Sequence, residues 1–212
     1  MRTALIILCC SLLSLTGCAL KVVPEQVNFG TVDTKNNSLS VTKDGISITT
    51  KVSDTEIEAY NLENTVAAFS VTIKNQSGKE FPIDGDSFLL VDDSGRQYFP
   101  LTPARVKEII AKDSYYLIPY PYVGFYYLED YERSSFYNTF NSQLPYYYEV
   151  YPQDIYTKAL TDGVVIPHAA LSGLVYFRID LATVKGVKLL FYRKGTSKSA
   201  QPDFSFPFRI EK

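Results

Sequence analysis

The sequence contains no tryptophan, one histidine, one methionine and three cysteines among 212 residues. The cysteines Cys9, Cys10 and Cys18 all lie near the N-terminus, so the rest of the chain offers neither an internal disulfide nor a cysteine-ligated metal site. The single histidine, His168, has no partners at the spacing of a metal site or a catalytic triad. We therefore expect His168 to lie in a loop or turn.

Strong charge of either sign is also lacking, because the formal net charge is only -2. The sequence has no basic stripe, so no nucleic-acid partner is expected. The glycines are scattered at turns and form no phosphate-binding loop, and we expect no cofactor and no metal. The apolar content is ordinary for a globular protein, so wholesale disorder is not expected.

The first hydrophobic run is short. Arg2 precedes the apolar stretch 4–13, which as a helix would span about 15 Å. Because crossing a bilayer takes about 20 apolar residues, the pattern predicts a cleaved signal segment at residues 1–17 and not a permanent span. A buried core helix and an ordinary secretory signal are the alternatives.

The residues Leu15-Thr16-Gly17-Cys18 favour a more specific interpretation, because they resemble the lipobox of bacterial lipoproteins. The resemblance implies a diacylglycerol on the Cys18 thiol and cleavage before it. It also implies that the protein lies in a bacterial cell envelope, where the lipid on Cys18 anchors it to a membrane. Ala19 after that cysteine implies the periplasmic face of the outer membrane if the organism is Gram-negative.

Beyond Cys18 we expect residues 18–45 to form a lipidated N-terminus and tether, with a short strand near Val27, Phe29 and Val32 and a loop at 33–40. A β-domain is expected at 46–212, with an insertion at about 100–165. Apolar residues alternate with polar ones in strand-like segments. These segments are 46–52, 67–73, 88–91, 96–99, 175–179, 187–191 and 204–210. Pro207 predicts that the last strand lies at a sheet edge, or turns that position outward.

About seven short strands separated by turns predict an antiparallel β-sandwich. The segments 69–75, 89–98 and 173–177 are similar to the immunoglobulin-like, telokin-like domains of exported bacterial lipoproteins. The resemblance covers about half of the chain beyond Cys18. It implies an immunoglobulin-like sandwich, interrupted here by the insertion.

Within the insertion, Thr102 followed by Pro103 predicts the start of an amphipathic helix at 103–112. A second helix is expected to open at Pro152 and end at Asp162-Gly163, and a third to cover 129–140.

The insertion also holds most of the tyrosines of the chain. Tyrosine combines a large contact area with a polar tip, as binding surfaces require. The candidate ligand surface consists of Tyr120, Tyr122, Tyr126, Tyr127 and Tyr147. The alternative is that these rings only pack the insertion onto the domain.

Acidic residues give few catalytic candidates. Asp84, Asp86 and the pair Asp92-Asp93 lie near glycines but lack the spacing of a calcium loop, so we interpret them as turn residues. Glu129 and Asp130 would suit sugar hydrolysis, but acids at a helix start are usually capping or surface charges. The sequence therefore predicts a lipid-anchored, non-enzymatic envelope protein that binds another protein or envelope component. The alternative is a carbohydrate- or peptidoglycan-binding module that uses the tyrosines.

Overall fold

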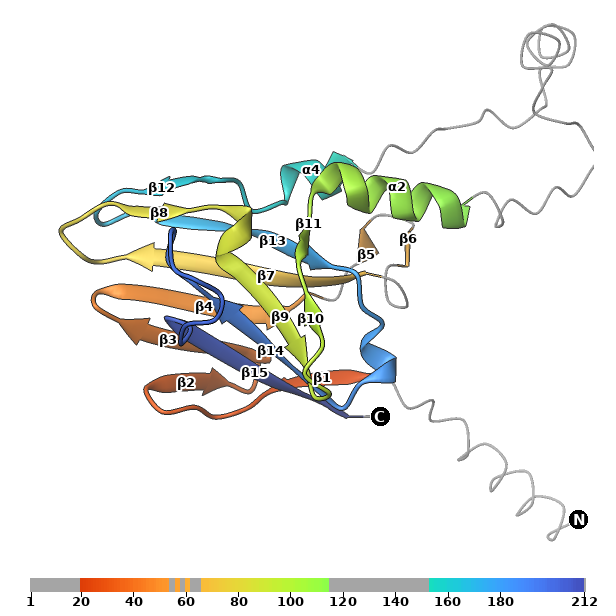
Figure 1. The fold of residues 1–212 in the computed structure, drawn as a ribbon, viewed down its shortest axis with the longest axis horizontal. Coiled ribbons are helices and arrows are strands. Elements are labelled where there is room, and N and C mark those ends of the chain that lie inside the picture. The colour runs from red at the N-terminus through yellow and green to blue at the C-terminus, as the bar shows by residue number, and fades with distance from the viewer. Residues whose placement is uncertain (1–19, 54–55, 58–59, 62–65, 115–152, 212) are drawn as a thin grey trace, which may run out of the picture.

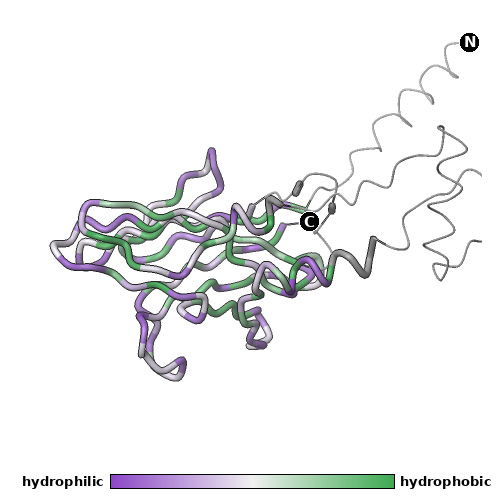
Figure 2. The backbone as a smooth tube through the Cα atoms, turned by 90° about the horizontal axis from the view of Figure 1, so that it is seen from above, coloured by the Kyte–Doolittle hydropathy of each residue, from purple (hydrophilic) through white to green (hydrophobic). Residues whose placement is uncertain are grey.

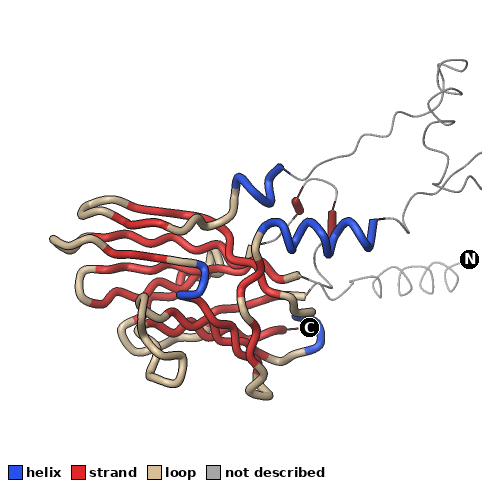
Figure 3. The backbone as a smooth tube through the Cα atoms, turned by 45° about the horizontal axis from the view of Figure 1, so that its top comes forward, coloured by secondary structure: helices blue, strands red, loops and turns tan. Residues whose placement is uncertain are grey.

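The computed structural model describes residues 20–53, 56–57, 60–61, 66–114 and 153–211. The described chain is mainly β, and its paired strands run antiparallel (Figure 1). The main strands form two layers, and the two helices lie together at one end (Figure 3). The predicted mainly β, antiparallel fold is confirmed, and its immunoglobulin-like character stays a prediction.

One layer is a five-stranded sheet in which the first and last described strands are neighbours. Its strands, in spatial order, are β1 (Lys21–Pro24), β15 (Phe204–Glu211), β14 (Gly186–Phe191), β9 (Phe88–Asp92) and β10 (Gln97–Tyr98). The predicted strand segments 88–91 and 96–99 correspond to β9 and β10, which pair as an antiparallel hairpin.

The other layer is a six-stranded sheet. Its strands, in spatial order, are β11 (Pro100–Leu101), β13 (Ala170–Phe177), β7 (Ala67–Asn75), β4 (Ile46–Val52), β3 (Ser38–Lys43) and β2 (Gly30–Asp33). Two small pairs join β12 (Gly163–Val165) to β8 (Phe81–Ile83) and β5 (Glu56–Ile57) to β6 (Tyr60–Asn61). The helices are α2 (Pro103–Ser114) and α4 (Gln153–Thr157), and short 3₁₀ turns cover Gly85–Ser87 and Leu181–Thr183.

The main core lies between the two sheets and is rich in phenylalanine. Phe69 of β7 meets Phe208 of β15 with ring centroids 5.7 Å apart, so aromatic contacts join the layers directly. Hydrophobic segments follow the strands, and hydrophilic colour gathers at many of the loops (Figure 2). The alternation predicted for residues 204–210 is confirmed, because Phe204, Phe206, Phe208 and Ile210 are all buried. Burial of such side chains stabilises the fold by about 1.5–3 kcal/mol each.

Pro207 shows how a proline is accommodated inside a sheet. In the sheet order β15 lies between β1 and β14, but β1 pairs only with residues 208–211 of it, so the prediction of an edge strand is wrong for that half of the strand. The register places Pro207 one residue beyond the end of β1, where its carbonyl accepts a hydrogen bond from the Glu25 N–H at 2.9 Å. The half-buried Pro207 lies on the outward side of the strand, as the second alternative predicted.

The N-terminal prediction needs correction. Residues 21–24 pair with β15 and residues 30–43 form β2 and β3, so the described chain belongs to the sheets from Lys21 onward and is not a tether up to residue 45. The loop predicted at 33–40 ends where β3 begins, because Leu39 and Val41 turn into the core between outward hydroxyl residues. Phe29 is not a strand residue: it precedes β2 at φ 63° and is 93% exposed.

Candidate binding surface

The outer face of the six-stranded sheet carries an unbroken row of hydroxyl residues across five strands. Side chains alternate between the two faces of a strand, so residues that pair in register share a face and form a row. The row consists of Ser172 on β13, Thr72 on β7, Thr49 on β4, Ser40 on β3 and Thr31 on β2. Two hydroxyl pairs in it are hydrogen-bonded, Ser40 with Thr49 at 2.7 Å and Thr72 with Ser172 at 2.9 Å.

A second row runs beside the first. Lys51 on β4 pairs with Ser70 on β7, and the β3–β4 register, continued one residue past the Leu39–Thr50 pair, places Ser38 on the other side of Lys51. The lysine therefore lies between two serines. Among the described residues, none of these three side chains has a hydrogen-bond or ion-pair partner. The polar atoms of this row are therefore available to a ligand.

These two rows enclose a shallow groove of about 190 Å³. The residues that line it, here called the hydroxyl groove, are Asn36, Ser38, Thr49, Thr50, Lys51, Ser70 and Thr72. The one charged side chain among them is the exposed Lys51. The nearest acid in the same row is Asp33, which pairs with Ser38 on the far side of β3 from Lys51.

The carboxylate of Asp33 is already engaged in the turn that follows β2. It accepts hydrogen bonds from the Lys35 N–H at 2.9 Å and from the Asn36 N–H and side-chain amide at 3.3 and 2.7 Å. These bonds, first among them the one from the Asn36 side chain, lower the pKa of Asp33 from its ordinary value. The same bonds fix the Asn36 side chain at the rim of the groove.

The outer face at the Ala67 end of β7 and the Phe177 end of β13 is apolar and covered by helices. Here α2 and α4 pack on each other and on the ends of β7 and β13 (Figure 1). Their contact forms a second buried cluster, separate from the main core, of Val66, Ala68, Val106, Ile109, Ile155 and Tyr176. The helix predicted at 103–112 is confirmed, and its residues Val106 and Ile109 are buried. The Thr102 hydroxyl caps it by accepting the Arg105 N–H at 3.3 Å.

The predicted second helix is shorter than expected and ends at Thr157. After it the chain runs along β13, where the Leu160 N–H donates to the Leu174 carbonyl at 2.9 Å and the Leu174 N–H to the Lys158 carbonyl at 2.7 Å. Gly173 permits this approach, since a Cβ there would lie 2.4 Å from the Leu160 Cα. Strand-like pairing to β13 therefore replaces the last helical turns that the sequence pattern predicted.

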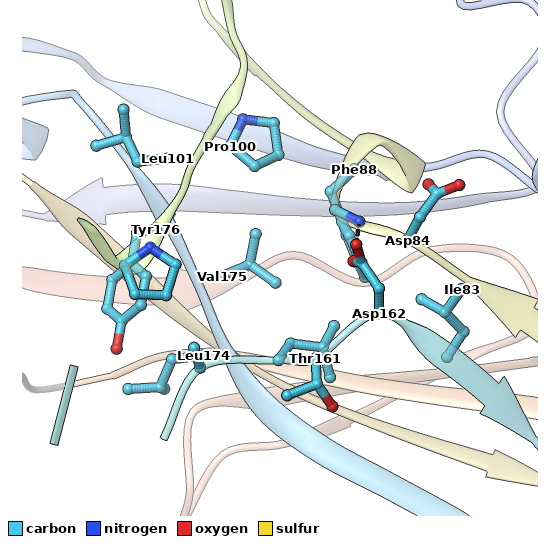
Figure 4. Close-up of a pocket in the computed structure, with 14 residues that line it drawn as sticks. Ile83, Asp84, Phe88, Pro100, Leu101, Thr161, Asp162, Leu174, Val175 and Tyr176 are labelled. Atoms are coloured by element: carbon cyan, nitrogen blue, oxygen red, sulfur yellow. Dashed lines mark hydrogen bonds between the residues drawn. The ribbon is translucent and has the colours of Figure 1, made fainter. Parts of the chain in front are cut away.

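A small cavity of about 50 Å³ lies where this segment meets β11 and the turn after β8 (Figure 4). Asp162 closes one side, and its carboxylate accepts the Gly85 N–H at 2.7 Å. A space of this size holds water molecules but is too small for a sugar-sized ligand. The hydroxyl groove is the larger of the two hollows.

The acids near glycine behave as turn residues. Asp84 caps the 3₁₀ turn at Gly85–Ser87, and Asp92 closes the hairpin of β9 and β10. The buried carboxylate of Asp92 accepts hydrogen bonds from Ser94, Arg96 and Tyr98 at 2.7–2.9 Å. Burial raises the pKa of Asp92, but these hydrogen bonds together outweigh burial and hold it well below its ordinary value. Burial and the bond to Asp92 raise the pKa of Tyr98.

The predicted turn position of His168 is confirmed, since it is exposed at φ 62° and its N–H donates to the Asn75 carbonyl at 2.7 Å. Within the described ranges no three acidic, histidine or cysteine side chains gather as metal ligands. No helix in the same ranges has both the length and the apolar character to cross a bilayer.

The other predicted site residues lie outside the described residues. These are Cys18, the five tyrosines Tyr120, Tyr122, Tyr126, Tyr127 and Tyr147, the acids Glu129 and Asp130, and the helix predicted at 129–140. The described helices α2 and α4 are the two ends between which the tyrosine-rich residues 115–152 lie in the sequence. The predictions about those residues stay predictions.

Comparison with models of protein families gives no match, and comparison with curated proteins gives none. Among solved structures, the chain is similar to the protein ycdA of Bacillus subtilis, a provisionally assigned lipoprotein, with TM-score 0.41 and 13% identity over 81% of this chain and 38% of that one. It is also similar to the yjhA protein of Bacillus subtilis, with TM-score 0.40 and 11% identity over 79% of this chain and 93% of that one.

A functionally unknown protein of Listeria monocytogenes gives a TM-score of 0.36 and 15% identity, over 92% of this chain and 87% of that one. This chain spans only 38% of the length of ycdA. All of these TM-scores are low, and no property of these proteins transfers to this chain on their strength.

Proposed function

We propose that this protein is a lipid-anchored, non-enzymatic protein of a bacterial cell envelope, built on an immunoglobulin-like sandwich, that binds another envelope protein. The binding surface in this proposal is the outer face of the six-stranded sheet near α2 and α4. The observation that carries it is the second apolar cluster, which fixes both helices to the sheet independently of the main core. A separate cluster of this kind holds the two ends of the insertion in place.

Site-directed photo-crosslinking in intact cells tests this surface. A photoreactive residue at Ala104, an exposed position of α2, is expected to form an adduct with the partner protein. The matched control is Lys188, an exposed position of β14 on the other sheet, which should give no adduct. Adducts of equal yield from both positions, or from Lys188 alone, would contradict the proposed surface.

A second candidate function is binding of carbohydrate or peptidoglycan through the tyrosine-rich insertion. The hydroxyl groove favours it, because a hydroxyl-lined hollow lies on the same sheet face as the helices that flank the insertion. Pull-down on purified peptidoglycan should then weaken in Tyr120→Ala and Tyr126→Ala. Tyr156→Ala, which removes an exposed tyrosine of α4, should bind as the unmodified protein does.

The proposed anchor is the lipid on Cys18, and it is tested separately from binding. Metabolic labelling with a radioactive fatty acid should label the protein, and Cys18→Ala should abolish the label and release the protein from membranes. Cys9→Ala, in the same N-terminal segment, should keep both. Retention of label in Cys18→Ala would contradict the lipid anchor, and membrane fractionation would test the proposed outer-membrane location.

A further inference from the structure

We propose that the hydroxyl groove is a binding site for an acidic saccharide, meaning a sugar unit that carries a carboxylate. The site is distinct from the surface near α2 and α4 proposed above, and it depends neither on the lipid anchor nor on the tyrosine-rich residues. Its residues come from β3, β4, β7 and the turn before β3.

The spacing of polar groups in the groove is regular. Neighbouring strands lie about 4.8 Å apart, so the row Ser38, Lys51, Ser70 places the backbone of a serine about that far on each side of the Lys51 backbone. The adjacent row adds Thr49 and Thr72. A ligand lying across the strands therefore meets a line of hydrogen-bonding groups with a cation at its centre.

The lining chemistry selects a polyhydroxylated ligand. Serine and threonine hydroxyls donate and accept hydrogen bonds, and the Asn36 amide offers both kinds of group, which complements sugar hydroxyls. None of the residues that line the groove is aromatic, so hydrogen bonding and charge have to supply the affinity without ring stacking. A hydrophilic saccharide fits this lining better than a flat neutral polymer or an apolar peptide.

The positive charge of Lys51 favours a ligand that carries a carboxylate. In the described part of the chain Lys51 has no ion-pair partner, and the nearest acid of the row, Asp33, is two strands away with its carboxylate held by three N–H donors. A ligand carboxylate would thus find an unpaired cation flanked by hydroxyl donors. Hydrogen bonds between ions are stronger than neutral ones, so Lys51 should contribute most of the affinity.

Isothermal titration calorimetry with trigalacturonate as the probe tests the site. The expected dissociation constant is about 1 mM or lower at low ionic strength, because a small open groove offers few contacts. The fully methyl-esterified trimer keeps the rings but loses the charges, and it should bind at least about tenfold more weakly. Lys51→Ala should weaken binding of the acidic trimer by about tenfold or more, and Ser70→Ala by a smaller factor.

Lys188→Ala removes an exposed lysine from the outer face of the other sheet and should leave binding unchanged. Circular dichroism should show both lysine variants folded, since each side chain is exposed. Equal losses in Lys51→Ala and Lys188→Ala, equal binding of the esterified trimer, or no heat of binding at about ten times the expected constant would each overturn the proposal. Competition by acetate at equal carboxylate concentration would overturn its saccharide part.

Discussion

The outer face of the six-stranded sheet has two halves that differ in their side-chain chemistry and in whether helices cover them. At one end of β7 and β13, Ala68 and Tyr176 lie under α2 and α4 in a buried apolar cluster. At the other end of the same strands, Thr72 and Ser172 are open to solvent and bond to each other. On β7, the face changes from covered to open within two outward-facing positions, from Ala68 to Thr72.

The difference shows that strand pairing alone does not determine the use of a sheet face. Both halves share the β7–β13 ladder, and only the outward side chains change. An apolar outward position has to be covered, and here the insertion supplies the cover. A hydroxyl position has no such need, because water and neighbouring hydroxyls satisfy it. We therefore assign anchoring of the insertion to the covered half and small-ligand binding to the open half.

The largest expected effect on the free energy of unfolding is at Gly173, where the segment after α4 approaches β13 closely in the covered half. Gly173→Ala should destabilise the protein by about 3 kcal/mol, because the new Cβ would force the segment after α4 away from β13. Urea denaturation measures the change. Gly163→Ala, at a position with open space around it, should alter the unfolding free energy by less than about 0.5 kcal/mol. Equal effects of the two substitutions would show that the close approach does not hold the covered half together.

The contribution of the buried Asp92 to the free energy of unfolding can be compared with that of the open hydroxyls. Asp92→Asn should cost about 2 kcal/mol at pH 7, since a buried carboxylate that accepts several hydrogen bonds would become partly unsatisfied. Asp93→Asn, at the exposed neighbour, is the control and should cost little.

The pH dependence of the same variant has a defined sign. The pKa of Asp92 in the folded state lies below the unfolded value of about 3.9, so its stabilising contribution is complete above that value and is lost as the pH falls. The difference in unfolding free energy between the unmodified protein and Asp92→Asn should therefore shrink between about pH 5 and pH 2. A difference that grows on acidification would contradict the described hydrogen bonds.

A smaller effect is expected inside the covered cluster. Ile155→Val removes one methylene from a fully buried side chain of α4 and should destabilise by about 1 kcal/mol. Val164→Ala shortens an exposed apolar side chain on β12 and should change stability by less than about 0.5 kcal/mol. If both substitutions have equally small effects in thermal or urea unfolding, α4 is not seated on the sheet as described.

The smallest change in the free energy of unfolding is expected for substitutions in the open half. Thr72→Val and Thr49→Val each remove a solvent-facing hydroxyl, and each should change the unfolding free energy by no more than about 0.5 kcal/mol. Losses of unfolding free energy above about 1 kcal/mol would mean that the hydroxyl row stabilises the fold, which would weaken its assignment to binding.

Local alternation of apolar residues predicted most of the strands that line the main core, but not all of them. Residues 204–210 and 67–73 bury every second side chain, and the sequence pattern predicted both. The strand β3 was missed because its outward residues are Ser38, Ser40 and Thr42, which made the stretch look like a polar loop. The alternating Leu39 and Val41 were the signal that could have found it.

The hydroxyl groove could not be predicted in the same way. It depends on the register between strands far apart in the sequence, such as Thr72 and Ser172, and no local pattern specifies that register. The early end of α4 likewise depends on the contact of Leu160 with Gly173. The candidate site predicted from the sequence was placed in the tyrosine-rich residues 115–152, whereas the groove lies on the regular strands beside their flanking helices.

The contrast between the two halves is tested most directly by mapping trigalacturonate onto the ¹⁵N-labelled protein by NMR. Backbone amide shifts are expected at Thr49, Lys51, Ser70 and Thr72 in the open half, while Ala104 of α2 and Lys188 of β14 stay unchanged. Shifts that gather on α2, on the five-stranded sheet or evenly over the surface would contradict binding by the open half. So would a spectrum that the trimer leaves unchanged.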